Sequence, residues 1–217
     1  MLRKSRSMGQ PATGGTFKAS APYDITAEGL TPIFDNLDRK YPDGTYFAGS
    51  AAAILGPNNP LGAAENWRAT AFTPTVSRNV TAIQVPISWI DFGEEDTTVY
   101  VSLNADDGTG LPGPILEKWK ADIGGNPLGT CCALITRRST GIPVTAGLQY
   151  WIAVGTGSNS DVVAGWNPND TQELSSEDLP VALWCSSPSG QCQVNNAWTL
   201  LPAGVIHPAP AFAVYGK

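Results

Sequence analysis

The sequence predicts an all-β protein, a jelly-roll-like sandwich of two antiparallel sheets with about ten short strands and little or no helix. Short segments along most of the chain alternate apolar and polar residues, which is the period of a strand with one buried face. The 23 glycines and 18 prolines divide these segments at frequent turns. Apolar residues at helical spacing are not sustained over any window of about eleven residues.

The first strands are expected at residues 45–55 and 67–72, before the clearest one at 80–90. In that third segment the odd-numbered residues from Ile83 to Trp89 share one face, and the even-numbered residues share the other. Its Pro86 has no N–H to donate to a neighbouring strand, so we expect a sheet edge or a bulge there.

The next strand, at residues 97–105, alternates regularly. The side chains expected to point inward are Val99, Val101 and Leu103, and those expected to point outward are Thr98, Tyr100, Ser102 and Asn104. Further strands or short extended pieces are expected at 115–120, 133–138, 140–147, 148–154, 162–167, 181–186, 197–201 and 211–215. Within 148–154, Trp151 lies on the face opposite the apolar stripe of its strand.

We expect residues 23–217 to form a single β-sandwich domain, because such domains often reach this size undivided. Residues 1–22 are rich in Gly, Pro, Ser and Ala and predict a flexible basic leader, either the remnant of an export signal or an arm used in assembly. The leader resembles the basic start of a signal peptide. No apolar stretch of about 7–15 residues follows it, so no export signal is visible.

The charge of the chain is unevenly distributed. The leader holds four of the thirteen basic residues and no acidic one. The body therefore has nine basic and nineteen acidic residues, a charge of −10, while the whole chain has a net charge of −6. An acidic body does not attract a polyphosphate, so we expect no nucleic-acid partner. No segment approaches the length of a transmembrane helix, and we expect no membrane insertion.

Several stretches, taken in order, resemble a bacterial family, the choice-of-anchor R domain. The matching stretches are IFDNL from Ile33, AFTPT from Ala71 leading into VTAIQVPI, VYVSL, ILEKW, CCAL, GIPVTAGLQYWIAV, AGWN and the closing AFAVYG. The match covers roughly Thr31 to Gly216. The resemblance implies an extracellular or cell-surface β-sandwich used for display or interaction. The family has no established activity, so the resemblance supplies no catalytic residues.

The four cysteines suggest at least one disulfide. Cys185 and Cys192 bracket the loop SSPSGQ, and we predict a bond between them, which fits an oxidising compartment. Neighbouring residues of a strand point to opposite faces, so a bond between Cys131 and Cys132 requires a distorted peptide. Two alternatives stay open for that pair: a strained vicinal disulfide, or one buried thiol with the other beside a neighbouring strand or bonded elsewhere.

Clustered acids in two predicted loops are weak candidates for calcium ligands. They are Asp91, Glu94, Glu95, Asp96, Asp106 and Asp107. Calcium requires oxygen ligands of this kind, but the EF-hand spacing is missing and acids on a loop are usually only solvated. We therefore expect no cofactor, with calcium as the one open alternative. Structural zinc is disfavoured, because the chain has a single histidine.

Seven tryptophans give the strongest indication of a ligand site. Trp166 is followed by Asn167 and Asn169, and an aromatic ring beside amides and carboxylates suits a sugar ring. Packing in the core is the alternative for these tryptophans. The candidate ligand-binding residues are Trp151, Asp161, Trp166, Asn167 and Asn169.

The leading hypothesis is a non-enzymatic extracellular binding or adhesion module that contacts a glycan or a protein at a cell surface. No nucleophile motif or other catalytic constellation is present in the sequence. One alternative is a self-associating structural subunit of a surface layer, an extracellular filament or a phage particle. Another is a carbohydrate-active enzyme that uses a pair of Asp or Glu residues.

Overall fold

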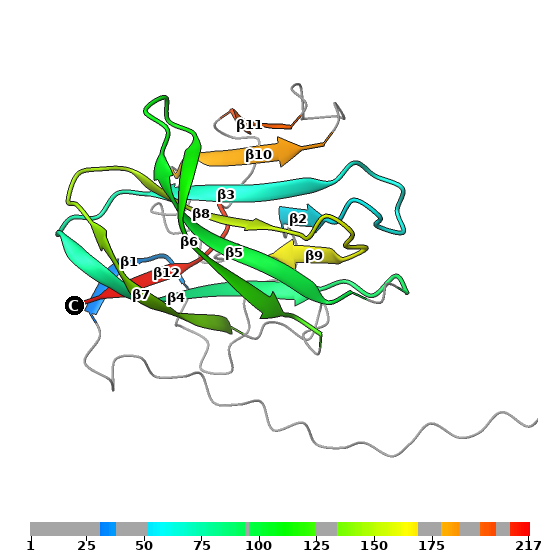
Figure 1. Ribbon diagram of the computed structural model, residues 1–217, viewed down its shortest axis with the longest axis horizontal. Coiled ribbons are helices and arrows are strands. Elements are labelled where there is room, and N and C mark those ends of the chain that lie inside the picture. Colours follow the sequence, from blue (N-terminus) through cyan, green and yellow to red (C-terminus); the bar gives the residue numbers. More distant parts are fainter. Residues whose placement is uncertain are drawn as a thin grey trace, which may run out of the picture.

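The computed structural model describes residues 31–37, 52–93, 96–124, 134–168, 179–186, 196–202 and 209–217. Within these ranges the chain forms twelve strands and no helix, which confirms the predicted all-β class (Figure 1). The strands are β1 (Thr31–Asp35), β2 (Ala52–Leu55), β3 (Asn66–Phe72), β4 (Arg78–Trp89), β5 (Thr98–Asp106), β6 (Pro112–Asp122), β7 (Leu134–Val144), β8 (Tyr150–Gly155), β9 (Val163–Trp166), β10 (Val181–Cys185), β11 (Ala197–Leu200) and β12 (Ala213–Gly216).

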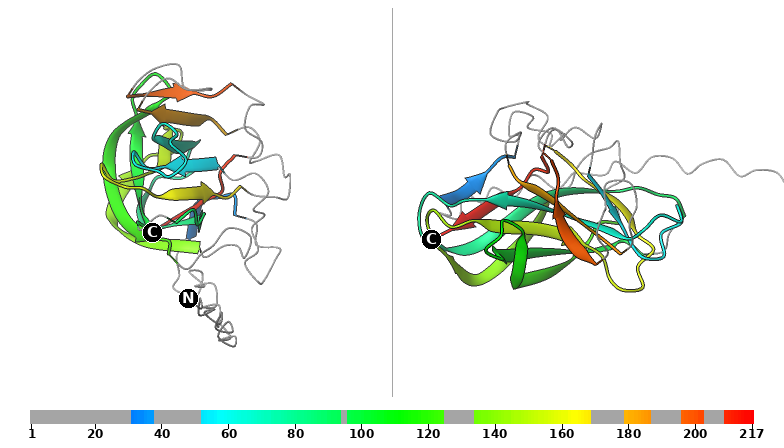
Figure 2. Two further views of the ribbon diagram at one scale, coloured as in Figure 1. Left: turned by 90° about the vertical axis from the view of Figure 1, so that its right-hand side faces the viewer. Right: turned by 90° about the horizontal axis from the view of Figure 1, so that it is seen from above.

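All pairings between these strands are antiparallel, and they join into one hydrogen-bonded network. The main path runs β1-β12-β4-β9-β2-β3-β8-β5-β6, with β7 beside β4 and the β10-β11 pair beside β3. We expected two separate sheets, but β4 pairs with β12 and β7 along most of its length and with β9 at its end. The strands therefore form one continuous sheet that curves around its core (Figure 2).

Pro86 lies where β4 changes partners. On one side, β12 pairs with β4 up to Gln84, and β9 pairs with it from Ile87 onward. The missing N–H of Pro86 falls between these two ladders, where it interrupts neither. Its carbonyl oxygen accepts a hydrogen bond of 2.9 Å from the backbone N–H of Asn167, just after β9. The proline therefore lies at the change of partner, with β7 paired along its other side, and not at an edge or a bulge.

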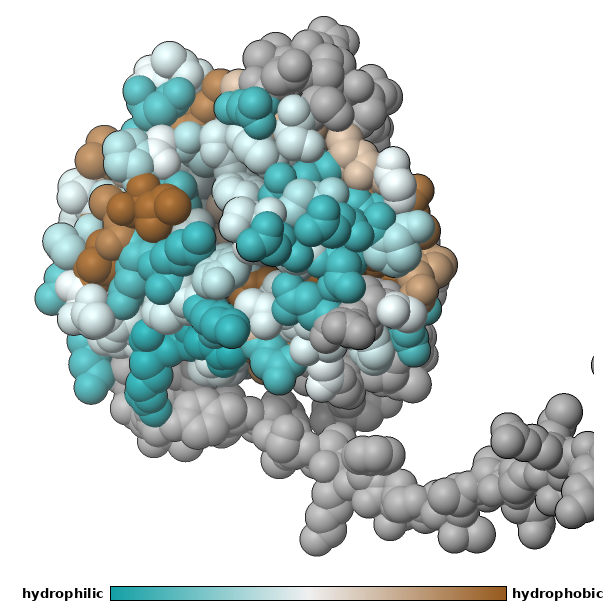
Figure 3. Space-filling view, turned by 45° about the vertical axis from the view of Figure 1, so that its right-hand side comes forward, coloured by the Kyte–Doolittle hydropathy of each residue, from teal (hydrophilic) through white to brown (hydrophobic). Residues whose placement is uncertain are grey.

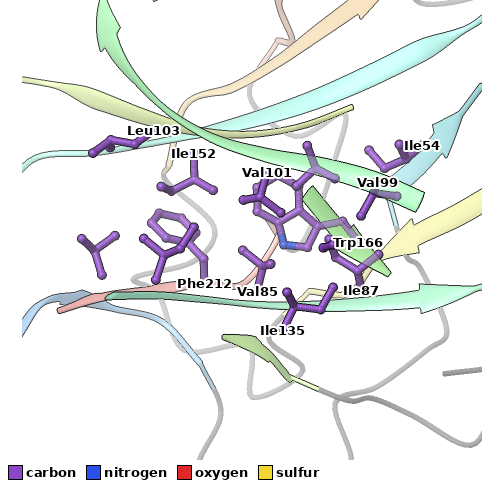
Figure 4. Close-up of a cluster of buried hydrophobic side chains, with 14 of the residues drawn as sticks. Ile54, Val85, Ile87, Val99, Val101, Leu103, Ile135, Ile152, Trp166 and Phe212 are labelled. Atoms are coloured by element: carbon purple, nitrogen blue, oxygen red, sulfur yellow. The ribbon is translucent and has the colours of Figure 1, made fainter. Parts of the chain in front are cut away.

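The main core lies between opposing parts of this curved sheet (Figure 4). Val101, Leu103 and Ile152 approach it from β5 and β8, and Val85 and Ile87 approach it from β4 on the other side. All five side chains are fully buried. Full burial of an aliphatic side chain stabilises a fold by about 1.5–3 kcal/mol, so this layer of side chains is the main source of stability.

The two strands β6 and β7 approach each other without forming a ladder. The indole N–H of Trp119 donates to the carbonyl oxygen of Arg138 at 2.8 Å, and the Nε of Arg137 donates to the carbonyl oxygen of Lys120 at 3.0 Å. The carboxylate of Glu117 accepts from the backbone N–H of Thr140 at 3.0 Å. Side chains thus link the end of the main path to the strand beside β4.

The strand bounds differ most from the prediction in three places. β1 was not predicted as a strand, and it pairs with β12 near the other end of the chain. β6 is longer than the predicted 115–120, because it pairs with β5 over nearly its whole length. The predicted pieces 133–138 and 140–147 form one strand, β7, in which Gly141 adopts a φ of 104° that a side chain would disfavour.

Parts of the predicted organisation lie outside the described residues, namely the basic leader, residues 45–51 and the adjacent cysteines Cys131 and Cys132. The part of the chain that is described includes no helix long and apolar enough to span a membrane.

Candidate functional site

The sheet face that points away from the main core carries a row of small side chains. The pairing register places Ala182 of β10 beside Ala69 of β3, and Ala69 beside Ala153 of β8. The row ends on β5 with Ser102, opposite Ala153. Small side chains leave space above a sheet, and larger side chains in the neighbouring rows form its sides.

The neighbouring row is aromatic. Cross-strand pairing places Trp198 opposite Trp184, and Trp184 opposite Trp67. The rings of Trp67 and Trp184 stack with their centroids 4.6 Å apart. Trp67 extends across Gly155 of β8, where an added Cβ would lie only 2.4 Å from the indole Cδ2. Glycine at this position therefore permits the ring to lie against the backbone.

These rows border a cavity of about 150 Å³, which we call the aromatic pocket. Its lining residues come from five strands or their ends and are Trp67, Tyr100, Ser102, Asn104, Gly113, Ile115, Lys118, Ala153, Gly155, Thr156 and Trp198. The three aromatic side chains among them are each partly exposed, so their rings remain accessible from solvent. The pocket is smaller than the roughly 300–1,000 Å³ of sites for drug-sized ligands, and suits a single ring.

Polar groups on β5 lie at the base of the aromatic pocket. The hydroxyl of Ser102 donates to the Oδ1 of Asn104 at 2.8 Å, and the Nδ2 of Asn104 donates to the carbonyl oxygen of Gly113 at 3.0 Å. Both side chains are buried. These contacts fix the amide orientation, so that Nδ2, which has two hydrogens, uses one of them within the protein.

Opposite charges lie at the two sides of the pocket. On the β6 side, the Nζ of Lys118 lies 4.2 Å from the centroid of the Tyr100 ring. Toward β3, the Oε1 of Glu65 accepts hydrogen bonds from the Nε1 of Trp67 at 2.9 Å and from the hydroxyl of Thr156 at 3.2 Å. Glu65 thereby holds one edge of the Trp67 ring in place.

The predicted tryptophan candidates are both fully buried. The Nε1 of Trp166 donates to the carbonyl oxygen of Ala211 at 2.7 Å, and its ring packs edge-on against Phe212 in the main core. The Nε1 of Trp151 donates to the Oδ2 of Asp106 at 3.1 Å beneath the outer face. Without an exposed ring face neither indole can stack on a sugar, and their burial favours the alternative of core packing.

The other predicted ligand residues are also engaged within the protein. Asn167 is fully buried and its Nδ2 donates to the hydroxyl of Ser88 at 2.8 Å. The Oδ1 of Asp161 accepts from the backbone N–H of Asp96 at 2.9 Å. Asn169 lies outside the described residues. The structure therefore does not bring Trp151 and Trp166 together, since one lies beneath the outer face and the other in the core.

The described calcium candidates act as caps of turns. The Oδ1 of Asp91 accepts from the N–H of Gly93, that of Asp96 from Thr98, and that of Asp107 from Thr109. Among described residues, no three His, Cys, Asp or Glu side chains form a group that could hold a metal ion. Glu94 and Glu95 lie outside the described residues, so calcium binding by this cluster stays a prediction. The turn hydrogen bonds of the described carboxylates do not require calcium.

Asp106 has the most contacts of these carboxylates. Its Oδ1 accepts from the N–H groups of Gly108 and Gly110, and its Oδ2 accepts from Trp151 and from the Nε2 of Gln149. Desolvation acts to raise the pKa of Asp106, but these hydrogen bonds stabilise the charged form and together lower the pKa below its ordinary value of 3.8. Asp106 thus links the β5–β6 turn to the indole N–H of Trp151.

Cys185 lies at the end of β10, is buried, and is not a free thiol. Its predicted partner, Cys192, lies outside the described residues, so the pairing between these two cysteines stays a prediction.

The residues of the aromatic pocket were missed, although the sequence carried two signals for them. Tyr100, Ser102 and Asn104 alternate with the apolar stripe of their strand and were expected to point outward. Trp67, Trp184 and Trp198 each lie in a separate predicted strand. The sequence carries no signal for the pairing of β3 with both β8 and β10. This pairing brings residues more than a hundred positions apart into one row.

No protein-family model matches the chain, and no match was found among curated proteins or solved structures. The resemblance to the choice-of-anchor R domain therefore stays a prediction.

Proposed function

We propose that this protein is a non-enzymatic binding module whose aromatic pocket holds one sugar ring of a glycan. The observation that carries the proposal is the combination of partly exposed rings with fixed polar groups in one pocket: Trp67, Tyr100 and Trp198 beside Ser102, Asn104 and Thr156. The apolar C–H face of a sugar packs on aromatic rings, while its hydroxyl groups need such donors and acceptors.

The form of the surface supports a local site. On the face shown in Figure 3, hydrophobic residues lie in small groups among hydrophilic ones. An obligate protein interface usually has a broader apolar centre, so a glycan of which only one ring is buried is the better fit. Binding through a protein partner is the alternative outcome of the test below.

We further propose that the protein works outside the cell or at its surface. The absence of a free thiol at Cys185 supports an oxidising environment.

The test is isothermal titration calorimetry of the full chain with oligosaccharides of glucose, xylose, mannose, galactose, N-acetylglucosamine and uronic acids. We expect at least one to bind, and Trp198→Ala to weaken that binding by about tenfold or more, because it removes one ring of the pocket. Phe92→Ala is the matched control, since Phe92 is 53% exposed and does not line the pocket.

Equal losses of affinity in Trp198→Ala and Phe92→Ala, or no binding to any oligosaccharide, would contradict the proposal. Hydrolysis of an oligosaccharide that stops in Glu65→Gln would instead support an enzyme. Concentration-dependent assembly without sugar binding would favour the structural subunit.

A further inference from the structure

We propose that the aromatic pocket prefers a sugar that carries a carboxylate, such as a uronic acid, and that Lys118 forms the ion pair with it. This inference rests on the proposed function and names the class of glycan that the pocket takes. It follows from the placement of charge around the pocket, which is independent of the aromatic rings that support glycan binding in general.

Lys118 is the single charged residue among the described residues that line the pocket. Its strand register places it opposite Ser102 of β5, where the small-residue row ends. Its ammonium group lies 4.2 Å from the centroid of the Tyr100 ring, a cation–π contact that holds the charge over the pocket. No carboxylate pairs with this ammonium group in the described contacts, so its charge is available to a ligand.

A second donor lines the same pocket. The Nδ2 of Asn104 donates one hydrogen to the carbonyl oxygen of Gly113 at 3.0 Å and retains another. Asn104 is 4% exposed and lines the pocket, so this donor is fixed and largely desolvated. A carboxylate has two acceptor oxygens, which match one charged donor on Lys118 and one amide donor on Asn104.

The acidic group near the pocket lies on the other side and is already engaged. Glu65 accepts from Trp67 and Thr156, two residues on the β3 and β8 side, whereas Lys118 is on β6. Strand β5 separates these two sides in the sheet. A ligand carboxylate therefore orients toward β6, away from Glu65, and the sugar ring lies between the two charges.

The test compares oligosaccharides that differ only in this charge. We would titrate the full chain with oligogalacturonate, oligomannuronate and oligoglucuronate and with the methyl ester of each, which retains the sugar ring and removes the charge. For the oligosaccharide that binds most tightly, the acid is expected to bind the protein about tenfold more strongly than its methyl ester does. This difference in affinity should shrink in 1 M salt. Lys118→Gln should abolish that difference, because it removes the charged partner of the carboxylate.

Lys120→Gln is the matched control. Lys120 lies two residues along the same strand, on the same face, and is opposite Tyr100, but it does not line the pocket. It should retain most of the acid preference. The inference is overturned if acids and esters bind equally, or if both lysine variants reduce the preference to the same extent.

The outcomes separate this inference from the proposed function. Tight binding of neutral oligosaccharides with no preference for acids overturns only the role of Lys118. A lack of binding to acids, esters and neutral sugars alike overturns both.

Discussion

The indole of Trp67 lies directly against the backbone of Gly155, so closely that a Cβ on residue 155 would be 2.4 Å from the indole Cδ2. The ring cannot move away easily, because its other neighbour, Trp184, stacks on it at 4.6 Å. Glu65 also holds the indole N–H at 2.9 Å. One glycine therefore sets the position of an aromatic wall of the proposed binding pocket.

Gly155→Ala is expected to destabilise the fold by about 1–3 kcal/mol and to weaken oligosaccharide binding, since the indole must be displaced from the pocket. Gly157→Ala is the control, because its added Cβ would lie 3.6 Å from the Tyr100 ring, an ordinary contact. Urea denaturation and calorimetry would measure both effects. Equal stability of the two variants would mean that Trp67 does not lie on Gly155 in solution.

Asp106→Asn is expected to destabilise the protein at neutral pH by about 1–3 kcal/mol, because an amide group cannot accept from four donors around one carboxylate. Asp91→Asn should cost less, since the described contact of Asp91 is a single backbone N–H in an exposed turn. Thermal unfolding at pH 7 would compare the two variants. A larger loss for Asp91→Asn would contradict the anchoring role of Asp106.

The same carboxylate predicts a pH dependence with a defined sign. The pKa of Asp106 is lowered in the folded protein, so below the ordinary value of 3.8 the unfolded chain binds this proton more readily than the folded one. Its contribution is fully present above pH 3.8 and is lost as the pH falls through the folded pKa. The stability difference between wild type and Asp106→Asn should therefore shrink below about pH 4. A difference that stays constant from pH 7 to pH 2 would exclude this linkage.

Arg68→Met is expected to leave stability unchanged or to increase it. Arg68 is 9% exposed, burial lowers its pKa to about 10, and its NH1 has no hydrogen-bond partner. Its Nε makes one long hydrogen bond, of 3.4 Å, to the carbonyl oxygen of Ala53, and a buried charge with an unpaired donor costs more than a methionine of similar volume. Arg137→Met is the comparison, since it removes hydrogen bonds to the carbonyl oxygens of Lys120 and Thr136 and should lower the melting temperature. A greater loss for Arg68→Met would show that the guanidinium is paired in solution.

The cysteines predict a mass-spectrometric result. Cys185 is not a free thiol, and we expect reduction of the protein to add two alkylated cysteines, Cys185 and Cys192, while the alternatives for Cys131 and Cys132 stay open. A digest without reduction should contain a peptide that joins Cys185 to Cys192, and loss of that bond should cost about 2–3 kcal/mol. Four free thiols in protein from its native source would contradict both the pairing and the extracellular location.

The fold class was predictable because it depends on local alternation. The pattern from Val99 to Leu103 predicts which side chains of β5 point into the core, and the structure buries Val99, Val101 and Leu103 there. Pairing across the sheet depends on contacts between distant segments, and alternation alone does not determine them. For that reason β1 beside β12 was missed, and the expected two sheets are joined through β4.

The candidate site was predictable only in its kinds of residue. Trp151 was correctly placed on the face opposite its apolar stripe, but that face is itself covered near Leu111 and Trp198, so the indole is buried. The sequence does not show whether a tryptophan on the outer face of a strand is covered by other parts of the protein or exposed to solvent. The partly exposed rings of the pocket lie two rows away, beyond the row of small side chains, on Trp67 and Trp198.

The central claim is that Trp67 and Trp198 contact a bound glycan. The most direct measurement is a two-dimensional ¹⁵N–¹H spectrum of the tryptophan indole groups, recorded while the oligosaccharide that binds most tightly in calorimetry is added. The account predicts that the indole signals of Trp67 and Trp198 shift together and give the dissociation constant found by calorimetry. The indole signal of Trp166, which is hydrogen-bonded to Ala211 in the core, should not shift. Saturating ligand that leaves the signals of Trp67 and Trp198 unmoved would contradict it.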